Sequence, residues 1–290
     1  MRTSALFTLL CFKTSVLAHS RVWGVWVNGE FQGDGTNVYI RSPETNYPVK
    51  DLYSKDMVCN TDNRVAPQSI TVKSGDKLTF EWYHESRHDD IITDTHKGPV
   101  QVYIAPTSSD LSGKSIWTKI FSDTYDTASK KWATIRLKKT KGQHSIIVPD
   151  IPSGDYIFRP EIIALHQALY PYNKKHDKGA EFYVSCVQIH IDNGSPTKKL
   201  PGGTSFPGTY SYDSRSIVWD LFGPRDKWNP KDYVAPGSEV WDGAKGGEDR
   251  EGWESVKATL PYFGLKLSYY SSLGRCHSFT RAGLPSEIYL

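Results

Sequence analysis

The chain has 290 residues, of which 38% are hydrophobic and 13% aromatic, and its formal net charge is +3. This is long for one domain but fits a single all-β sandwich, with enough apolar side chains for a real core. The small net charge gives no basic excess that would favour nucleic acid, so we exclude nucleic acid as a partner.

The N-terminus has the features of a secretion signal. Arg2 makes a basic start, residues 4–12 form a short apolar run, and Val16 and Ala18 are small residues at the third and first positions before a cleavage site. The run is too short to span a membrane, so we expect a secreted, extracellular protein with no membrane partner. Cleavage after Ala18 would give His19 a free amino group beside its imidazole, which makes two nitrogen donors for one metal ion. Cleavage a residue or two away, or a buried hydrophobic arm, are the alternatives.

Short runs rich in β-branched and aromatic residues follow along the chain, separated by Gly, Pro and Asn turns. The Asn28-Gly29 pair predicts a hairpin turn. The turn at residues 74–77 predicts a second hairpin, with one face buried. We find no convincing amphipathic helix, so the pattern predicts an all-β fold, an immunoglobulin- or fibronectin-like antiparallel β-sandwich with long surface loops. In chain order, strands are expected at residues 22–27, 70–72, 78–83, 100–104, 145–149, 156–166 and 181–191.

Cysteine usage fits a secreted chain. Cys11 leaves with the signal, and the simplest interpretation of Cys59 and Cys186 is a disulfide, which contributes about 4 kcal/mol through chain entropy. Cys276 is left over near the C-terminus. Asn193 begins the only N-glycosylation sequon, just after a predicted strand, where a surface turn would lie.

The strand pattern weakens near residue 240, which divides the chain into three parts. Residues 1–18 are the expected signal peptide and residues 19–240 the expected sandwich domain. Residues 243–250 have a linker-like composition, and the rest of the expected extension, 241–290, has no regular period. This extension is either disordered or an error of gene prediction.

Several short motifs follow one another along the chain: His19 with residues 22–29, Cys59-Asn60, residues 78–82, 96–99, 103–106, 154–156 and 161–166, and Phe182-Tyr183 before Cys186. Together, in this order, they resemble the fungal lytic polysaccharide monooxygenases of auxiliary activity family 9, formerly glycoside hydrolase family 61. The resemblance covers about residues 19–240. It implies copper-dependent oxidative cleavage of β-1,4-glucan, such as cellulose, cello-oligosaccharides or xyloglucan, at C4 or C1.

The resemblance also implies a copper site with one ion per chain. His19 would bind copper through its amino group and one ring nitrogen, His96 would supply the third nitrogen, and Tyr183 would lie at the axial position. Amine and imidazole ligands in a planar, open arrangement suit copper(II). The reference pKa of an α-amino group is about 7.7–8.0, so losing its proton to a metal is inexpensive. Alone, a histidine beside a Gly-Pro turn, as at His96, would more often be an ordinary surface residue.

Two further residues are expected near the copper. His166 matches the family histidine that lines the pocket and donates to bound oxygen species. Glu181 stands where the family normally has Gln, and a Glu can donate a hydrogen bond only while protonated. Copper would favour the carboxylate, while burial would favour the acid. We therefore expect altered oxygen reactivity and a pH dependence that the Gln form lacks.

The resemblance places glucan contacts at Asn46, His84 and Tyr210, with Tyr210 stacking on a sugar ring. Glu85 departs from the Asn often found after His84, and the alternative is that the three contact residues are solvated loop side chains. The expected partners are the glucan, O2 or H2O2, and an external electron donor, either a small reductant or cellobiose dehydrogenase. The protein is expected to be a monomer.

Two other functions remain open on the sequence. The same sandwich could serve a non-catalytic copper- or glucan-binding secreted protein, since a fold does not fix function. A conventional hydrolase is a weaker alternative, because its paired carboxylates cannot be located. Asp89, Asp90 and Asp94 form only a charged loop.

Overall fold

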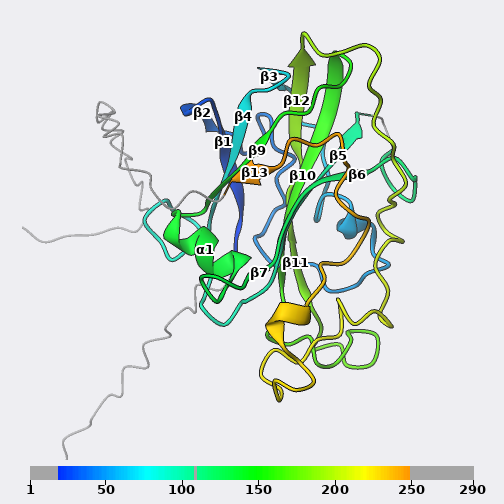
Figure 1. The fold of residues 1–290 in the computed structure, drawn as a ribbon. Coiled ribbons are helices and arrows are strands. Elements are labelled where there is room, and N and C mark those ends of the chain that lie inside the picture. The colour runs from blue at the N-terminus through cyan, green and yellow to red at the C-terminus, as the bar shows by residue number, and fades with distance from the viewer. Residues whose placement is uncertain (1–18, 108–109, 249–290) are drawn as a thin grey trace, which may run out of the picture. The chain divides into compact units, whose positions relative to one another are not determined.

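Two β-sheets face each other in the computed structural model, which describes residues 19–107 and 110–248 (Figure 1). The expected signal and most of the expected C-terminal extension, Cys276 included, lie outside the described residues. The first sheet has the strand order β13 (Gly247–Glu248), β9 (Gln143–Ile147), β4 (Lys77–Tyr83), β1 (Arg21–Val27), β2 (Glu30–Asp34). The second has the order β3 (Ile70–Lys73), β12 (Val187–Asp192), β10 (Gly154–Ala164), β5 (Val100–Pro106), β6 (Thr118–Asp123), with β11 (Glu181–Val184) also on β10.

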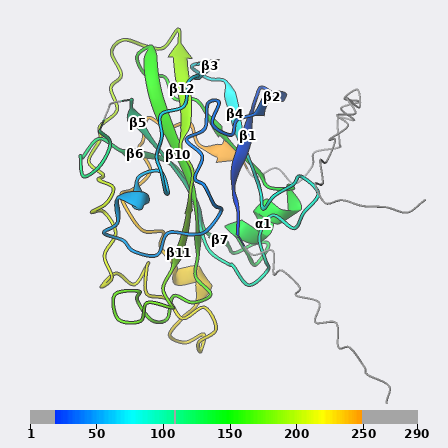
Figure 2. The ribbon, with the colours of Figure 1, turned by 180° about the vertical axis from the view of Figure 1, so that it is seen from behind.

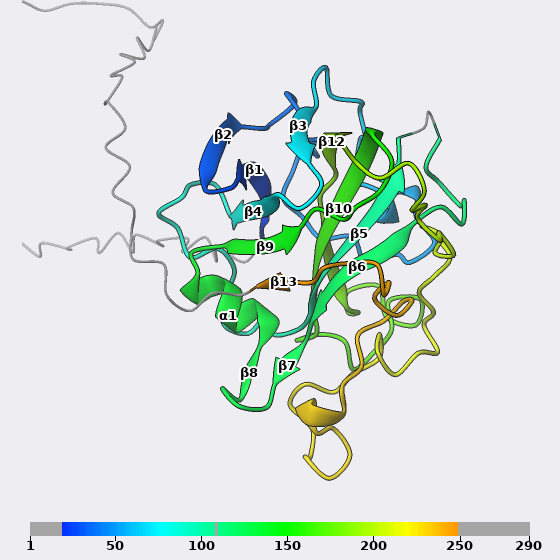
Figure 3. The ribbon, with the colours of Figure 1, turned by 45° about the horizontal axis from the view of Figure 1, so that its top comes forward.

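Short elements complete the fold, and the two rows of strands are visible in Figure 3. A two-stranded ribbon precedes the helix α1, and two 3-10 turns lie in long loops. Their bounds are β7 (Tyr125–Asp126), β8 (Lys131–Trp132), α1 (Ala133–Lys139), η1 (Lys55–Met57) and η2 (Pro230–Asp232). No helix among the described residues is long and apolar enough to cross a membrane.

The main core lies between the sheets, where apolar side chains of both inner faces meet. Phe80 and Trp82 of β4 and Phe158 and Ile162 of β10 belong to this core and are fully buried. Each apolar side chain removed from water contributes about 1.5–3 kcal/mol. The alternating apolar residues that predicted these strands are therefore the side chains that point into the core between the two sheets.

Long loops cover the outer face of the second sheet. Ile157 and Ile163 of β10 point to this face and are as buried as the core residues, because a second apolar cluster packs on them. These loops are residues 49–59 and 206–233. The view in Figure 2 shows the side of the molecule on which η1 lies. β10 is therefore buried on both faces, and Arg159 and Glu161 are its buried charged residues.

The predicted sandwich is confirmed, and strands occur in every predicted range. Asn28 and Gly29 have φ values of 52° and 90°, the left-handed conformation that a two-residue hairpin turn requires. The predicted disulfide is also confirmed: Cys59 and Cys186 are bonded, with their Cα atoms 5.2 Å apart. The sandwich extends past the predicted boundary at residue 240, because Gly247 and Glu248 pair with β9.

The predicted hairpin around residues 74–77 is wrong. β3 pairs in parallel with β12 of the second sheet, whereas β4 lies between β1 and β9 of the first. The turn carries the chain from one sheet to the other, so the strands on its two sides do not pair. The sandwich is consequently antiparallel except for this one parallel pair among the described strands.

Two other expectations were incomplete. The run 181–191 forms two strands, β11 and β12, in the same register on β10, and the break falls opposite Pro160. Ser185 donates its N–H to the Pro160 carbonyl at 3.1 Å, but proline has no N–H to return. The helix α1 was not predicted, because seven residues with no side-chain N-cap give little periodic signal.

Candidate metal centre

Four strand ends bring the predicted metal-site residues together. His19 precedes β1, His96 lies in the loop before β5, His166 follows β10, and Tyr183 lies within β11. The Tyr183 ring centroid is 6.2 Å from that of His19 and 6.2 Å from that of His96. The His96 and His166 rings lie 3.9 Å apart.

The local fold fixes the orientation of His96. Its Nδ1 is hydrogen-bonded to the hydroxyls of Thr93 and, at 3.1 Å, Thr95. Gly98 lies so close to β10 that a Cβ there would meet the carbonyl oxygen of Ile163 at 1.8 Å, so only glycine fits. With Nδ1 occupied, Nε2 points into the cluster and is the nitrogen available to a metal.

Glu181 is a buried carboxylate at the centre of the cluster. Its Oε1 lies 2.9 Å from the Lys50 ammonium, and its Oε2 accepts a hydrogen bond from the Tyr183 hydroxyl at 2.8 Å. The same Oε2 lies 3.5 Å from His96 Nε2 and 3.9 Å from His166 Nε2. Four side chains therefore surround the Glu181 carboxylate, and Glu181 is 5% exposed.

These neighbours decide the ionisation of Glu181. Burial raises the pKa of its carboxyl, but His96, His166 and Lys50 together lower the pKa further, to about 2. The side chain is thus an acceptor and not a donor at neutral pH. The altered oxygen reactivity and the pH dependence expected from Glu181 stay predictions.

The imidazole of His166 and the hydroxyl of Tyr183 are neutral at physiological pH. Burial lowers the pKa of His166 to about 4, against the opposing charge of Glu181. The Nδ1 of His166 is buried and has no hydrogen-bond partner among the described residues. Burial, with the charge and hydrogen bond of Glu181, raises the pKa of Tyr183 well above its usual value, so Tyr183 is a phenol.

Side-chain nitrogen and oxygen atoms of His96, His166 and Glu181 lie within 4.8 Å of one another and could act as metal ligands. This cluster shares His96 with the predicted set of ligands, which also contains His19 and Tyr183. In the uncut chain the backbone nitrogen of His19 is a peptide nitrogen, so the amine of the predicted site exists only after cleavage before His19.

Two of the three predicted glucan contacts border the metal cluster. Asn46 donates its side-chain N–H to the backbone carbonyl of His84 at 3.1 Å. Both line a groove of about 670 Å³ that also contains His19 and Tyr47. Tyr47 is 61% exposed and its ring meets that of His19 edge to face at 4.7 Å.

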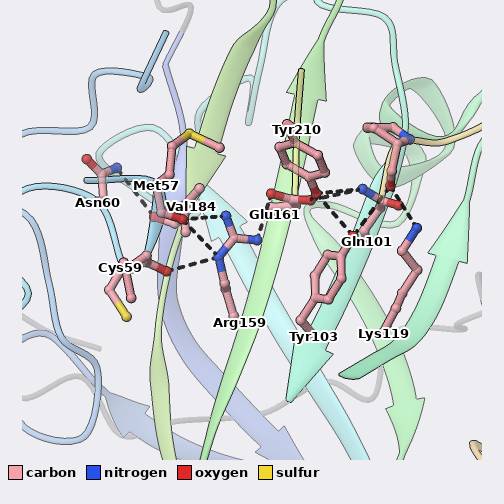
Figure 4. Close-up of polar contacts among 12 residues, drawn as sticks. Met57, Cys59, Asn60, Gln101, Tyr103, Lys119, Arg159, Glu161, Val184 and Tyr210 are labelled. Atoms are coloured by element: carbon pink, nitrogen blue, oxygen red, sulfur yellow. Dashed lines mark hydrogen bonds and ion pairs between the residues drawn. The ribbon is translucent and has the colours of Figure 1, made fainter. Parts of the chain in front are cut away.

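The third predicted glucan contact, Tyr210, is wrong. Tyr210 is 3% exposed, its ring stacks on Phe182, and its hydroxyl donates to Glu161 (Figure 4). The amide of Gln101 and the hydroxyl of Tyr103 lie 3.3 and 3.1 Å from the same hydroxyl. The side chain fills a buried polar network and has no face for a sugar ring.

Comparison with known proteins identifies the family. Residues 19–233 match the sequence model of Auxiliary Activity family 9, formerly glycoside hydrolase family 61. The chain belongs to Auxiliary Activity family 9. An AA9 family lytic polysaccharide monooxygenase A of Phanerochaete carnosa is 53% identical over 247 residues, which cover 85% of this chain and 90% of that protein. Another, of Armillaria gallica, is 48% identical and covers 85% of this chain and 97% of its own length.

A solved AA9 structure agrees. The structure of CvAA9A superposes with a TM-score of 0.73 at 38% identity, covering 78% of this chain and 99% of that chain. AA9 lytic polysaccharide monooxygenases are copper-dependent oxidative enzymes that act on polysaccharides. The donor atoms of this AA9 chain fit copper, because imidazole nitrogens beside an oxygen donor are ligands that copper(II) accepts.

Sequence reasoning missed Lys50, Tyr47 and Thr93 in this AA9 site. Lys50 and Tyr47 lie in a polar loop with no strand pattern, and Thr93 lies in a charged loop. The one sequence signal for Tyr47 was its position directly after Asn46, a predicted glucan contact. Nothing local in the sequence pointed to Lys50 or Thr93, because their partners are fixed by the tertiary fold.

Proposed function

We propose that the mature protein begins at His19 and binds one copper ion there. The amino group and one ring nitrogen of His19, with Nε2 of His96, would hold the ion, and the Tyr183 hydroxyl would be an oxygen donor beside them. The observation that carries this proposal is the orientation of His96, whose Nδ1 is held by threonine hydroxyls while Nε2 faces the cluster. The family match begins at residue 19, which supports cleavage at that position.

The proposed reaction is oxidative cleavage of β-1,4-glucan at C4 or C1, on cellulose, cello-oligosaccharides or xyloglucan. When bound, copper supplies the one-electron chemistry by which O2 or H2O2 oxidises a C–H bond at the glycosidic link. The groove beside His19, with Asn46 and His84 on its wall, supports a glucan chain lying next to the ligands. Amide and imidazole groups there can hydrogen-bond sugar hydroxyls.

The chain's own groups prepare this site. Tyr183, which donates to Glu181, remains a neutral phenol and would offer only a weak oxygen donor to the metal. His166 is a neutral imidazole beside His96 and can hold or donate a proton near the reacting oxygen. Burial lowers the pKa of His19 as well, which leaves its ring nitrogen lone pair available to a metal.

The remaining partners follow from this chemistry. An external reductant must supply electrons, either a small molecule or cellobiose dehydrogenase. We propose that the protein is secreted, works as a monomer and carries glycan at Asn193, which is exposed in a turn directly after β12. Secretion agrees with the confirmed disulfide, since disulfides persist in oxidising compartments.

The test uses the processed, copper-loaded protein with ascorbate and cello-oligosaccharides, with products analysed by mass spectrometry. We expect products that are heavier than hydrolytic fragments by one oxygen or lighter by two hydrogens, and none from a His96→Ala variant. Retained binding of copper and glucan without oxidised products would instead indicate a non-catalytic binding protein. Mass spectrometry of products labelled at the reducing end distinguishes C1 from C4.

A further inference from the structure

Lys50 is held against the copper site by the backbone. The residue before it, Val49, exchanges two backbone hydrogen bonds with Phe182, at 2.8 and 2.9 Å. This bridge fastens the loop after β2 to the middle of β11. It fixes the start of the Lys50 side chain beside Glu181, so their contact does not depend on a flexible surface loop.

The carboxylate of Glu181 is divided between two sides. Oε1 faces the Lys50 ammonium at 2.9 Å, and Oε2 accepts from Tyr183 and faces the two histidines. The Lys50 side chain is 23% exposed and that of Glu181 is 6% exposed. A pair this sheltered is less screened than a surface ion pair, and removing one partner leaves the other uncompensated.

The Lys50–Glu181 pair matters because Glu181 stands at a position where the family pattern has an uncharged residue. The family pattern has a neutral amide there, whereas this chain has a negative charge beside the proposed metal ligands. Of the described residues in contact with Glu181, Lys50 is the one that carries an ammonium group; the others are the imidazoles of His96 and His166 and the phenol of Tyr183.

We propose that Lys50 is a positioning residue that holds Glu181 by Oε1 and so keeps the carboxylate from turning toward the metal. The inference rests on the copper site proposed above. Without Lys50, the carboxylate would be free to turn toward the metal and would favour the doubly charged Cu(II) over Cu(I). Lys50 therefore acts on the metal through Glu181, and its direct field, from a partly solvated ammonium, is minor.

The experiment is a double-mutant cycle measured on copper itself. Cu(II) affinity by calorimetry, the Cu(II)/Cu(I) reduction potential and the Cu(II) electron paramagnetic resonance spectrum are recorded for processed wild type, Lys50→Met, Glu181→Gln and the double variant. We expect Lys50→Met to favour Cu(II) over Cu(I) by about tenfold in the wild-type background, equivalent to about 59 mV for a one-electron couple. In the Glu181→Gln background we expect the same substitution to change this ratio by less than about twofold.

Two variants control for non-specific effects. Lys50→Arg keeps the charge and the hydrogen-bond donors, and we expect it to restore most of the wild-type potential and spectrum. Lys174→Met removes a lysine from the exposed loop between β10 and β11, and we expect no change.

The outcomes separate this inference from the proposed function. An equal shift from Lys50→Met in both backgrounds, or no shift in either, with normal copper binding and glucan oxidation by the wild type, would overturn the role of Lys50 alone. Failure of the processed wild type to bind Cu(II) would overturn the proposed copper site, and this inference with it.

Discussion

At the scale of single residues, orientation decides what the histidines can do. An imidazole binds a metal through one nitrogen, and the hydrogen bond made by the other selects which one. In His96 that choice is made by the hydroxyls of Thr93 and Thr95. In His144 the Nδ1 accepts a hydrogen bond from Trp82 at 3.2 Å in a fully buried site, which makes this histidine structural.

Replacing Thr93 tests the orientation of His96. Thr93→Val keeps the shape of the side chain but removes the hydroxyl that contacts Nδ1. We expect Cu(II) affinity to fall by roughly tenfold, the usual effect of losing such a supporting contact. Calorimetric titration measures it, with Thr107→Val at an exposed position as the control. Unchanged affinity in Thr93→Val would mean that the loop orients His96 without this hydroxyl.

His144 gives a prediction on pH and stability. Burial lowers its pKa to about 3 in the folded chain, while an unfolded histidine has its ordinary value near 6.5. Below pH 6.5 the unfolded chain takes up a proton that the folded chain does not. The free energy of unfolding should therefore fall by up to about 1.4 kcal/mol per pH unit between pH 6.5 and 3, with no contribution above 6.5.

Urea unfolding at pH 7.5 and pH 5 measures this slope. In His144→Gln, which cannot take up the proton, the part of the slope due to this residue should vanish. The same pH slope in wild type and variant would show that His144 titrates normally in the folded protein.

At the scale of elements, one buried polar network joins β10 to the long loops of its outer face. Arg159 donates to the carbonyls of Met57 and Val58 in the loop with η1, and pairs with Glu161 at 2.7 Å (Figure 4). Glu161 in turn accepts from Tyr210 of the C-terminal loops. The strand therefore anchors both loops through charged side chains that are fully buried.

Removing the charge of Glu161 should weaken the attachment of these loops to β10 and lower the free energy of unfolding. Glu161→Gln leaves the Arg159 guanidinium buried without its counterion, which costs about 3 kcal/mol or more of unfolding free energy. Asp155→Asn, on the same strand but in an exposed pair with His190, should cost less than about 1 kcal/mol. Denaturant unfolding compares them, and equal losses in the two variants would contradict the network's role.

Sequence patterns predicted the elements whose burial follows a local period. β1, β4, β5 and β10 alternate or run apolar because one or both of their faces are buried, and these features are local. The β3–β4 turn looked like a hairpin, because nothing in four residues shows that the chain changes sheets there. The break between β11 and β12 depends on Pro160, which is distant in sequence.

The residues of the site divide in the same way into those that local motifs predict and those that only contacts distant in sequence determine. His19, His96, His166 and Tyr183 were predicted from a motif order typical of the family, and the fold brings them together. The glucan contact at Tyr210, which the resemblance implied, is wrong because the burial of Tyr210 is set by Glu161 on a strand far away in sequence. Lys50 could not be predicted for the same reason, since only the bridge between Val49 and Phe182 places it beside Glu181.

At the scale of the whole molecule, one covalent link ties the loop side of the sandwich together. The disulfide joins Cys59 after η1 to Cys186 between β11 and β12, 127 residues apart in sequence, and both residues are buried. Asn60, the residue after Cys59, donates its side-chain N–H to the Tyr47 carbonyl at 3.5 Å, so the disulfide is linked to the loop that carries Asn46, Tyr47 and Lys50. The disulfide therefore reduces the conformational entropy of the unfolded chain, and it restrains the loop that borders the proposed copper site.

Removing this disulfide should lower stability substantially. We expect the Cys59→Ala/Cys186→Ala variant to lose about 4 kcal/mol of unfolding free energy, mainly through the larger entropy of its unfolded chain. Calorimetric unfolding of both proteins at one pH measures it. A loss below about 1 kcal/mol would show that the loops hold their positions without the bond.

The central claim is that cleavage before His19 creates a copper ligand. The direct test is calorimetric titration of Cu(II) into the processed protein and into a matched chain that keeps Ala18 before His19. In the longer chain the His19 nitrogen is a peptide nitrogen, so we expect one tight copper site in the first protein and affinity weaker by roughly a hundredfold or more in the second. Equal affinity in the two proteins would contradict the account.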